Sequence, residues 1–228
     1  MQKTLAQELA SLGFFDEPTL LQQTSLLNSV TRQTYQPGEA IYVNGEESRS
    51  LFIIHSGLVK LLSYMPNGRS RIVRLHRRGS MIGLDGLMDE DHEHSAIAVD
   101  AVTTYQVPHG QLLGWKQDAP QLYAQLLEQW YQYLNYADTW ITEFSTGSVK
   151  GRVARLIGFL ADFDADTGPQ VVELLTTEEM SEILGVTPES VSRVVAEFKR
   201  DGLLQAIENN AESLFTFDRL KLEQGARE

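Results

Sequence analysis

The sequence predicts an α+β protein in three parts: a β-roll or jelly-roll domain, one long helix, and a small domain with two short helices followed by two strands. Turn signals recur from residue 31 to 108. Apolar residues then recur at helical spacing up to residue 144, and a capping pattern, a glycine and a Thr-Pro pair follow between 176 and 188. We place the domain boundaries at 1–117, 118–147 and 148–228.

Composition restricts the function. The chain has 228 residues, of which 42% are hydrophobic and 22% charged, as in ordinary globular proteins. It has no cysteine, which excludes disulfides, thiolate zinc sites and cysteine-ligated iron–sulfur clusters. The first fifteen residues have no apolar core, and no apolar run approaches about 20 residues. We therefore expect a cytoplasmic protein with no membrane segment.

The N-terminal domain is predicted from turn residues that recur between short β-rich runs. Helical spacing over residues 2–29 breaks at GFFDEP, after which short β-rich runs such as LFIIHSG and LVKLLSYM alternate with turns. Four glycines, at 45, 57, 68 and 79, are spaced 12, 11 and 11 residues apart. Asn67-Gly68 is the strongest hairpin signal among them.

After Asp118 and Pro120 nothing interrupts a helix until Ser-Thr-Gly-Ser at 145–148. One apolar line has the spacing of a coiled-coil seam: Leu122, Leu126, Trp130, Tyr133, Ala137, Trp140 and Phe144. A second apolar flank consists of Leu127, Leu134 and Ile141. One interpretation is a helix that only crosses its own domain. We favour a helix that covers the β-domain on one side and pairs with a second copy on the other, giving a homodimer.

A helix-turn-helix is predicted between residues 176 and 200. Thr176-Thr177-Glu178-Glu179 has the form of a capping box, Gly185 provides the turn, and Thr187 caps a helix that begins at Pro188. Two helices that cross steeply need a small residue at their contact, which is Ser181. The expected apolar positions are filled by Met180, Leu184, Val186, Val191 and Val194. The strand-like runs that follow, GLLQAI and SLFTF, would form a wing.

The second helix presents Glu189, Ser192 and Arg193 on one face. Arg193 can donate twice to guanine, Glu189 can accept from cytosine, and Ser192 can contact a base edge or a thymine methyl. Helix-start hydroxyls and nearby basic residues are candidate phosphate contacts: Thr176, Thr177, Thr187, Lys150, Arg152, Lys199 and Arg200. The net charge is −12, and residues 148–228 hold 9 basic against 15 acidic residues, so we expect little non-specific binding.

In this order, the parts resemble the Crp/Fnr superfamily of bacterial transcription regulators. The Glu-Ser-Val-Ser-Arg of residues 189–193 is similar to the Glu-x-x-Ser-Arg of the fumarate–nitrate regulator branch. The resemblance implies a cyclic-nucleotide-binding-like sensor domain, a dimerisation helix and a winged helix-turn-helix. It also implies a homodimer on double-stranded DNA, a palindromic site with TTGAT-like half-sites, and recruitment or blocking of RNA polymerase.

The sensor departs from the family pattern. Cyclic-AMP-binding members carry Gly-Glu-Leu followed by Arg-Ser, whereas residues 83–96 read GLDGLMDEDHEHSA. Leu84 replaces the ribose-binding glutamate, and His94 replaces the phosphate-pairing arginine with a poorer partner. The resemblance maps the effector pocket onto Gly83, Leu84, Asp85, His94, Ser95 and Asp138. We expect that it does not bind cyclic AMP, and that the effector is another small molecule or absent.

Two other kinds of site are suggested by histidines of the β-rich domain, a divalent metal site and a haem site. Gly86 followed by His92-x-His94 opens like the metal motif of cupins, in which two histidines on a strand chelate a divalent metal, but no matching glutamate or second motif follows. The alternative is thus a cupin-like metal-binding β-barrel with a helical appendage that does not bind DNA. His76 could ligate haem, although a lone histidine is more often structural. We find no catalytic constellation and expect a non-enzyme without a cofactor.

Overall fold

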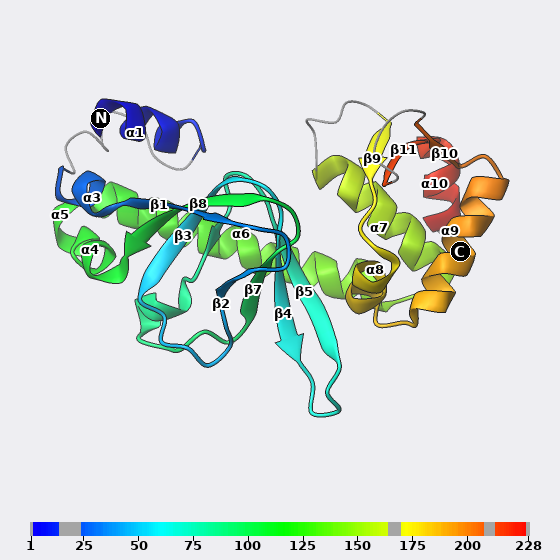
Figure 1. Ribbon diagram of the computed structural model, residues 1–228, viewed down its shortest axis with the longest axis horizontal. Coiled ribbons are helices and arrows are strands. Elements are labelled where there is room, and N and C mark those ends of the chain that lie inside the picture. Colours follow the sequence, from blue (N-terminus) through cyan, green and yellow to red (C-terminus); the bar gives the residue numbers. More distant parts are fainter. Residues whose placement is uncertain (1, 14–23, 164–169, 208–212, 227–228) are drawn as a thin grey trace. The chain divides into compact units, whose positions relative to one another are not determined.

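The computed structural model describes residues 2–13, 24–163, 170–207 and 213–226 (Figure 1). The chain forms two compact units, Met1–Asn135 and Tyr136–Glu228. The boundary between them falls within the sequence of the long helix α6 (Pro120–Ser145), which begins and ends where the sequence predicts. Among the described helices none is long and apolar enough to cross a membrane.

The N-terminal unit contains two four-stranded antiparallel sheets, with strand orders β1-β8-β3-β6 and β2-β7-β4-β5. The strands are β1 (Thr31–Tyr35), β2 (Ala40–Tyr42), β3 (Ser50–Ser56), β4 (Val59–Tyr64), β5 (Ser70–His76), β6 (Met81–Ile82), β7 (Ser95–Ala98) and β8 (Val102–Pro108). Apolar side chains from both sheets, including Phe52, Val59 and Ala96, form a core between them. The predicted β-roll is confirmed.

Tight turns connect these strands at the predicted glycines. In the β4–β5 hairpin the Met65 N–H donates to the Arg69 carbonyl at 2.8 Å, and Gly68 has a φ of +79°. Gly57 has a φ of +89° and lies so close to the chain that a Cβ there would meet the Ala101 oxygen at 2.6 Å. The first turn needs glycine for its backbone angle alone, and the second also needs it for space.

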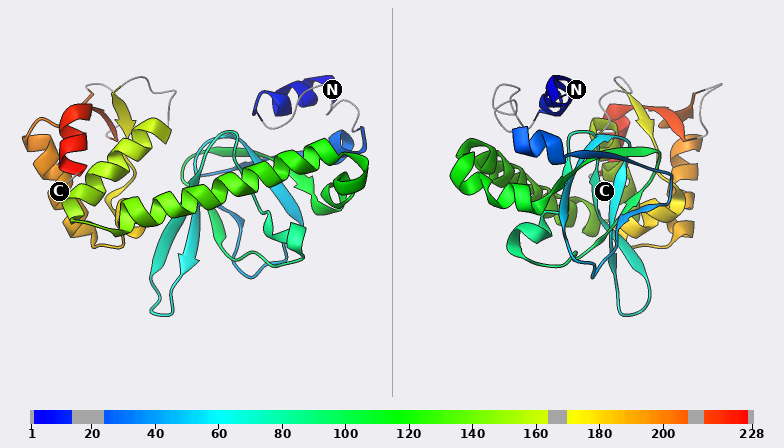
Figure 2. Two further views of the ribbon diagram at one scale, coloured as in Figure 1. Left: turned by 180° about the vertical axis from the view of Figure 1, so that it is seen from behind. Right: turned by 60° about the vertical axis from the view of Figure 1, so that its left-hand side comes forward.

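Helices cover the outside of the sheet that contains β3 and β8. They are α1 (Gln2–Ala10), α3 (Thr24–Ser29), α4 (His109–Leu113), α5 (Trp115–Asp118) and the first half of α6. Leu122 and Leu126 of α6 join a buried cluster with Leu51, Ile53 and Tyr105 of the sheet. Figure 2 shows this half of α6 running along the β-domain. The first part of the predicted apolar line therefore packs on the β-domain, whereas Trp140 and Phe144 contact Phe159 of the C-terminal unit. The predicted break at GFFDEP falls mostly outside the described residues.

The C-terminal unit packs helices against a three-stranded antiparallel sheet of order β10-β11-β9. Its elements after α6 are α7 (Val149–Phe163), β9 (Val171–Glu173), α8 (Thr177–Leu184), α9 (Pro188–Arg200), β10 (Leu204–Ala206), β11 (Leu214–Phe217) and α10 (Arg219–Ala226). The predicted helix-turn-helix and wing strands are confirmed. The final helix α10 was not predicted; it packs on α7, where Gly158 approaches Leu222.

The loop Ser-Thr-Gly-Ser, at 145–148, joins α6 to α7 and is held by Arg155. The guanidinium donates to the backbone oxygens of Glu143 at 2.8 Å, Thr146 at 2.5 Å and Ala226 at 2.5 Å. It also lies 3.2 Å from the Glu143 carboxylate. One side chain thus joins the end of α6, the loop and the end of α10.

We expect Gly57→Ala to destabilise the β-domain far more than Gly68→Ala. Both residues have a positive φ, which costs about 1 kcal/mol for alanine, but only Gly57 lacks room for a Cβ. The clash should add at least about 2 kcal/mol to the loss in the free energy of unfolding. Urea unfolding followed by circular dichroism measures both, and equal losses would contradict the steric explanation.

Candidate nucleic-acid interface and effector pocket

The turn between α8 and α9 is fixed by local hydrogen bonds. At the start of α8, Thr176 Oγ1 accepts from the Glu179 N–H at 3.2 Å, and the Glu179 carboxylate accepts from the Thr176 N–H at 3.1 Å. At its end, Gly185 adopts a left-handed φ of +63° and donates to the Ser181 oxygen at 2.8 Å. The predicted capping box and glycine turn are both confirmed.

Helix α9 has one buried and one exposed face. Thr187 caps it by accepting from the Ser190 N–H at 3.3 Å, and Pro188 occupies its first position. Val191, Val194 and Phe198 are buried. The exposed face then carries the three predicted base-reading residues, Glu189, Ser192 and Arg193.

Glu189 is held as a carboxylate at the start of α9. Hydrogen bonds from its own backbone N–H and from the Thr187 hydroxyl lower its pKa. Arg193 lies one turn further along the same exposed face. The surface therefore offers an acceptor, a hydroxyl and a bidentate donor to the groups at a base edge.

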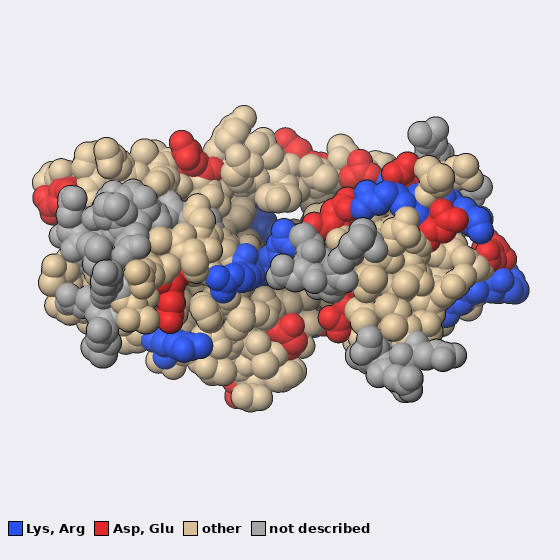
Figure 3. Space-filling model, turned by 90° about the horizontal axis from the view of Figure 1, so that it is seen from above, with Lys and Arg blue, Asp and Glu red and all other residues tan. Residues whose placement is uncertain are grey.

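The predicted phosphate contacts have different surroundings. The Lys150 ammonium pairs with Glu197 at 3.0 Å, and Lys199 lies 4.4 Å over the Phe215 ring. Arg152 donates to the Leu184 oxygen at 2.9 Å and so joins α7 to α8. Arg200 is exposed, 3.7 Å from Asp201. Basic and acidic side chains alternate on the face in Figure 3.

The three threonines lie at helix starts, as predicted. Thr176 and Thr187 are the exposed caps of α8 and α9, and half-buried Thr177 is the first residue of α8. Free backbone N–H groups at such positions suit phosphate oxygens. Whether any of the seven predicted residues contacts phosphate stays a prediction.

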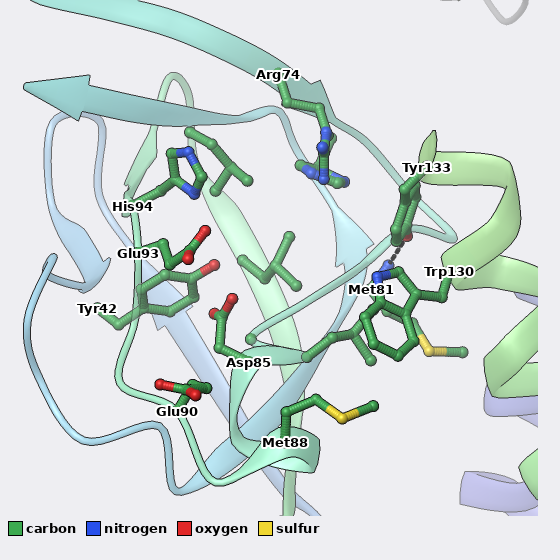
Figure 4. A pocket seen from close by; sticks show the side chains of 15 residues that line it. Tyr42, Arg74, Met81, Asp85, Met88, Glu90, Glu93, His94, Trp130 and Tyr133 are labelled. Atoms are coloured by element: carbon green, nitrogen blue, oxygen red, sulfur yellow. Dashed lines mark hydrogen bonds between the residues drawn. The ribbon is translucent and has the colours of Figure 1, made fainter. Parts of the chain in front are cut away.

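The N-terminal unit contains a cavity of about 290 Å³ (Figure 4). Its walls come from β2, β4, β5, the 83–94 segment with the short 3-10 helix η1 (Asp85–Met88), and α6. The lining residues are Tyr42, Leu61, Arg74, His76, Met81, Ile82, Gly83, Leu84, Asp85, Met88, Glu90, Glu93, His94, Trp130 and Tyr133.

Four of the six predicted pocket residues, Gly83, Leu84, Asp85 and His94, line this cavity. Ser95 does not line it: its side chain is buried and accepts from the Asn44 N–H at 3.0 Å. Asp138 belongs to the C-terminal unit and is exposed.

Sequence reasoning missed the basic group of the cavity, Arg74. Cross-strand pairing places Arg74 opposite Leu61 and His76 opposite Val59. Arg74 and His76 share one side of β5, since their partners Leu61 and Val59 lie two residues apart on β4. A register shift between Leu61 and Leu62, where Ile72 pairs, interrupts the alternation just before Arg74, so the sequence pattern alone did not indicate which way Arg74 faces.

The two histidines of the metal hypothesis do not lie on a strand, because β7 begins only at Ser95. The His92 ring is buried, stacked on Tyr42 with centroids 3.7 Å apart, and its Nδ1 lies 3.1 Å from Asp85. His94 lines the cavity instead. Among the described residues no three His, Asp or Glu side chains converge as a metal site. His109, which was not predicted, faces the Ser48 and Gly83 carbonyls at 2.8 and 3.0 Å.

Two family models match the chain. Residues 32–117 match the cyclic nucleotide-binding domain, and residues 151–224 match the Crp-like helix-turn-helix domain. The chain is 28% identical over 209 residues to the transcriptional activator protein FnrL of Cereibacter sphaeroides, covering 85% of this chain and 80% of FnrL. It is 27% identical over 203 residues to the CRP-like cAMP-activated global transcriptional regulator of Mycobacterium tuberculosis, covering 86% and 90%.

Solved structures share the fold. FixK2 from Bradyrhizobium japonicum has a TM-score of 0.74 at 22% identity and covers 86% of this chain and 96% of its own. The c-di-GMP responsive global regulator CLP from Xanthomonas campestris has a TM-score of 0.72 at 18% identity and covers 89% and 100%. With the two matched domains in this order around α6, the chain belongs to the Crp/Fnr superfamily of bacterial transcription regulators.

Proposed function

We propose that the protein regulates transcription by binding a palindromic DNA site as a homodimer, each α9 reading one half-site. The observation that carries the proposal is the exposed face of α9, where Glu189, Ser192 and Arg193 lie opposite the buried Val191, Val194 and Phe198. The Glu-x-x-Ser-Arg spacing supports TTGAT-like half-sites. The function requires no catalytic group, so the protein acts as a regulator and not as an enzyme.

The second apolar flank of α6 supports the dimer. Leu127, Leu134 and Ile141 recur every seven residues, and their exposed fractions are 45%, 60% and 62%. The line of residues that covers the β-domain includes the buried Leu122, Leu126 and Tyr133. An exposed apolar stripe at heptad spacing along a helix fits a twin helix, whose pairing removes the stripe from water.

The proposal extends to the partners and the cavity. Contact with RNA polymerase follows from the family, and the cavity in the β-domain is the effector site. The proposal includes neither a metal nor haem. His92 is engaged with Asp85 and Tyr42, and His76 is a single buried histidine at the cavity wall. A visible absorption spectrum and metal analysis of purified protein check this part.

Cyclic AMP is not the proposed effector. Because Arg74 provides a cation for a singly charged phosphate, the argument rests on Leu84, which stands in place of the ribose-binding glutamate. A ribose hydroxyl buried against Leu84 would lose its hydrogen bonds with water.

Arg193→Ala should reduce discrimination between a palindromic TTGAT-type site and a scrambled duplex by about 10- to 100-fold, because one bidentate base contact contributes about 1–3 kcal/mol. Fluorescence anisotropy with both duplexes measures it. Lys199→Ala is the matched control and should weaken both duplexes alike, since a phosphate contact carries no sequence information. Unchanged discrimination in Arg193→Ala would refute the proposed reading helix.

Leu134→Glu should convert the dimer to a monomer and abolish tight binding to the palindrome, because two carboxylates would meet in an apolar seam. Gln132→Glu adds the same charge on the polar side of α6 and should leave the dimer intact. Sedimentation equilibrium distinguishes the two variants. A dimeric Leu134→Glu protein would exclude this face as the interface.

Calorimetry with about 1 mM cyclic AMP should show no saturable heat for the wild type. The double substitution Leu84→Glu with His94→Arg restores both family anchors and should create measurable binding. Saturable binding to the wild type would contradict the proposal about the effector.

A further inference from the structure

The cavity of the β-domain contains a cation, Arg74, that forms no salt bridge among the described residues. Arg74 extends from β5 toward the cavity, as Figure 4 shows. Its Nε is buried without a hydrogen-bond partner. The charge of Asp85 acts on the guanidinium, but within the described residues Asp85 pairs with His92 and no salt bridge reaches Arg74. Its recorded contact is with the Tyr133 ring, 5.6 Å from the guanidinium carbon to the centroid. Such a group is stabilised by an anion that enters from solution.

Two histidines beside Arg74 are neutral donors or acceptors and not further cations. His76 is 2% exposed, and its Nε2 is buried without a hydrogen-bond partner. Burial, together with the charge of Arg74, lowers its pKa to about 3. The same two causes lower the pKa of half-buried His94. At neutral pH the positive charge of the cavity therefore comes from Arg74 alone.

Apolar side chains also line the cavity between these polar groups. On one side the aromatic rings of Trp130 and Tyr133 come from α6, and the Tyr133 oxygen is already used as an acceptor from the Met81 N–H at 2.7 Å. The other apolar lining residues are Leu61, Met81, Ile82, Leu84 and Met88. A ligand with an apolar body would be stabilised here, because that body would be buried against these side chains.

Acidic side chains line the part of the cavity away from β5. Asp85, Glu90 and Glu93 contribute there, and Asp85 lies 3.1 Å from His92 Nδ1. These carboxylates outnumber Arg74 and repel an anion with two or more charges. A ligand with a single negative charge can pair with Arg74 and keep its remaining atoms uncharged.

We propose that this cavity binds a small organic monocarboxylate, whose carboxylate forms paired hydrogen bonds with Arg74 and whose apolar body lies against Trp130 and Tyr133. The cavity is near the lower limit of about 300 Å³ for ligand pockets, which favours a compact ligand. A cyclic nucleotide would bring ribose and base polar groups against Leu84, Met81 and Trp130, which are poor partners for them. The proposal concerns the β-domain and holds whether or not α9 reads DNA.

The ligand side is tested by calorimetry on the full chain, without DNA. The probes are benzoate, phenylacetate, 3-phenylpropionate and hexanoate, each against its primary amide, with cyclic AMP as a further arm. We expect at least one acid to bind at one site per chain, and its amide to bind at least about tenfold more weakly. Failure of all four acids at about 10 mM, equal binding of the amide, or tighter binding of cyclic AMP would overturn the proposal.

The protein side uses Arg74→Met and Arg74→Lys, with Arg69→Met as the matched control on the exposed turn of the same hairpin. Arg74→Met should lose acid binding at least about tenfold, Arg74→Lys should retain part of it, and Arg69→Met should leave it unchanged. Without ligand, Arg74→Met should also melt at a higher temperature, because it removes an unpaired buried charge. Acid binding unchanged in Arg74→Met, or lost equally in Arg69→Met, would refute the site.

Discussion

The burial of one face of α9 is the constraint on which the proposed DNA-reading surface depends. Val191, Val194 and Phe198 can leave water only by packing against the rest of the C-terminal unit, and that packing fixes the rotation of the helix about its axis. Glu189 and Arg193 are exposed as a consequence, since they lie on the opposite side. The caps at Thr176 and Thr187 and the turn at Gly185 set where each helix begins and ends. A hydrophobic interaction thus determines which polar groups are offered to a partner.

Features coded by neighbouring residues were the ones that the sequence predicted well. The capping box, the Thr187-Pro188 start and the Asn67-Gly68 turn each depend on a few consecutive residues, and all appear in the structure. The cavity was predicted only in part, because its lining comes from segments far apart in the chain. Arg74 lines the cavity because β5 pairs with β4 in a register that places Arg74 opposite Leu61. Ser95 fits the family pattern but hydrogen-bonds to Asn44, a partner that only the fold brings near. Helix α10 was missed because its contact with α7 depends on small residues, Gly158 and Gly225.

Charge is distributed in a way that suits selective binding. Basic side chains near α9 are partly neutralised: Lys150 by Glu197 and Arg200 by Asp201. With a net charge of −12, the chain has little general attraction for phosphate. In the proposed complex, affinity would come from the few groups that fit base edges and from the two such surfaces of the proposed dimer. In the cavity of the β-domain acidic side chains also outnumber the cation, and Arg74 forms no salt bridge among the described residues.

The contacts of Arg155 have a mechanical consequence. Because this guanidinium holds the oxygens of Glu143, Thr146 and Ala226 together, the last turn of α6 and the whole of α7 behave as a single stiff body despite the glycine between them. Arg152 continues this chain of contacts, since its hydrogen bond to the Leu184 oxygen joins α7 to the end of α8. The three hydrogen bonds of Arg155 oppose bending at the loop even though it contains Gly147.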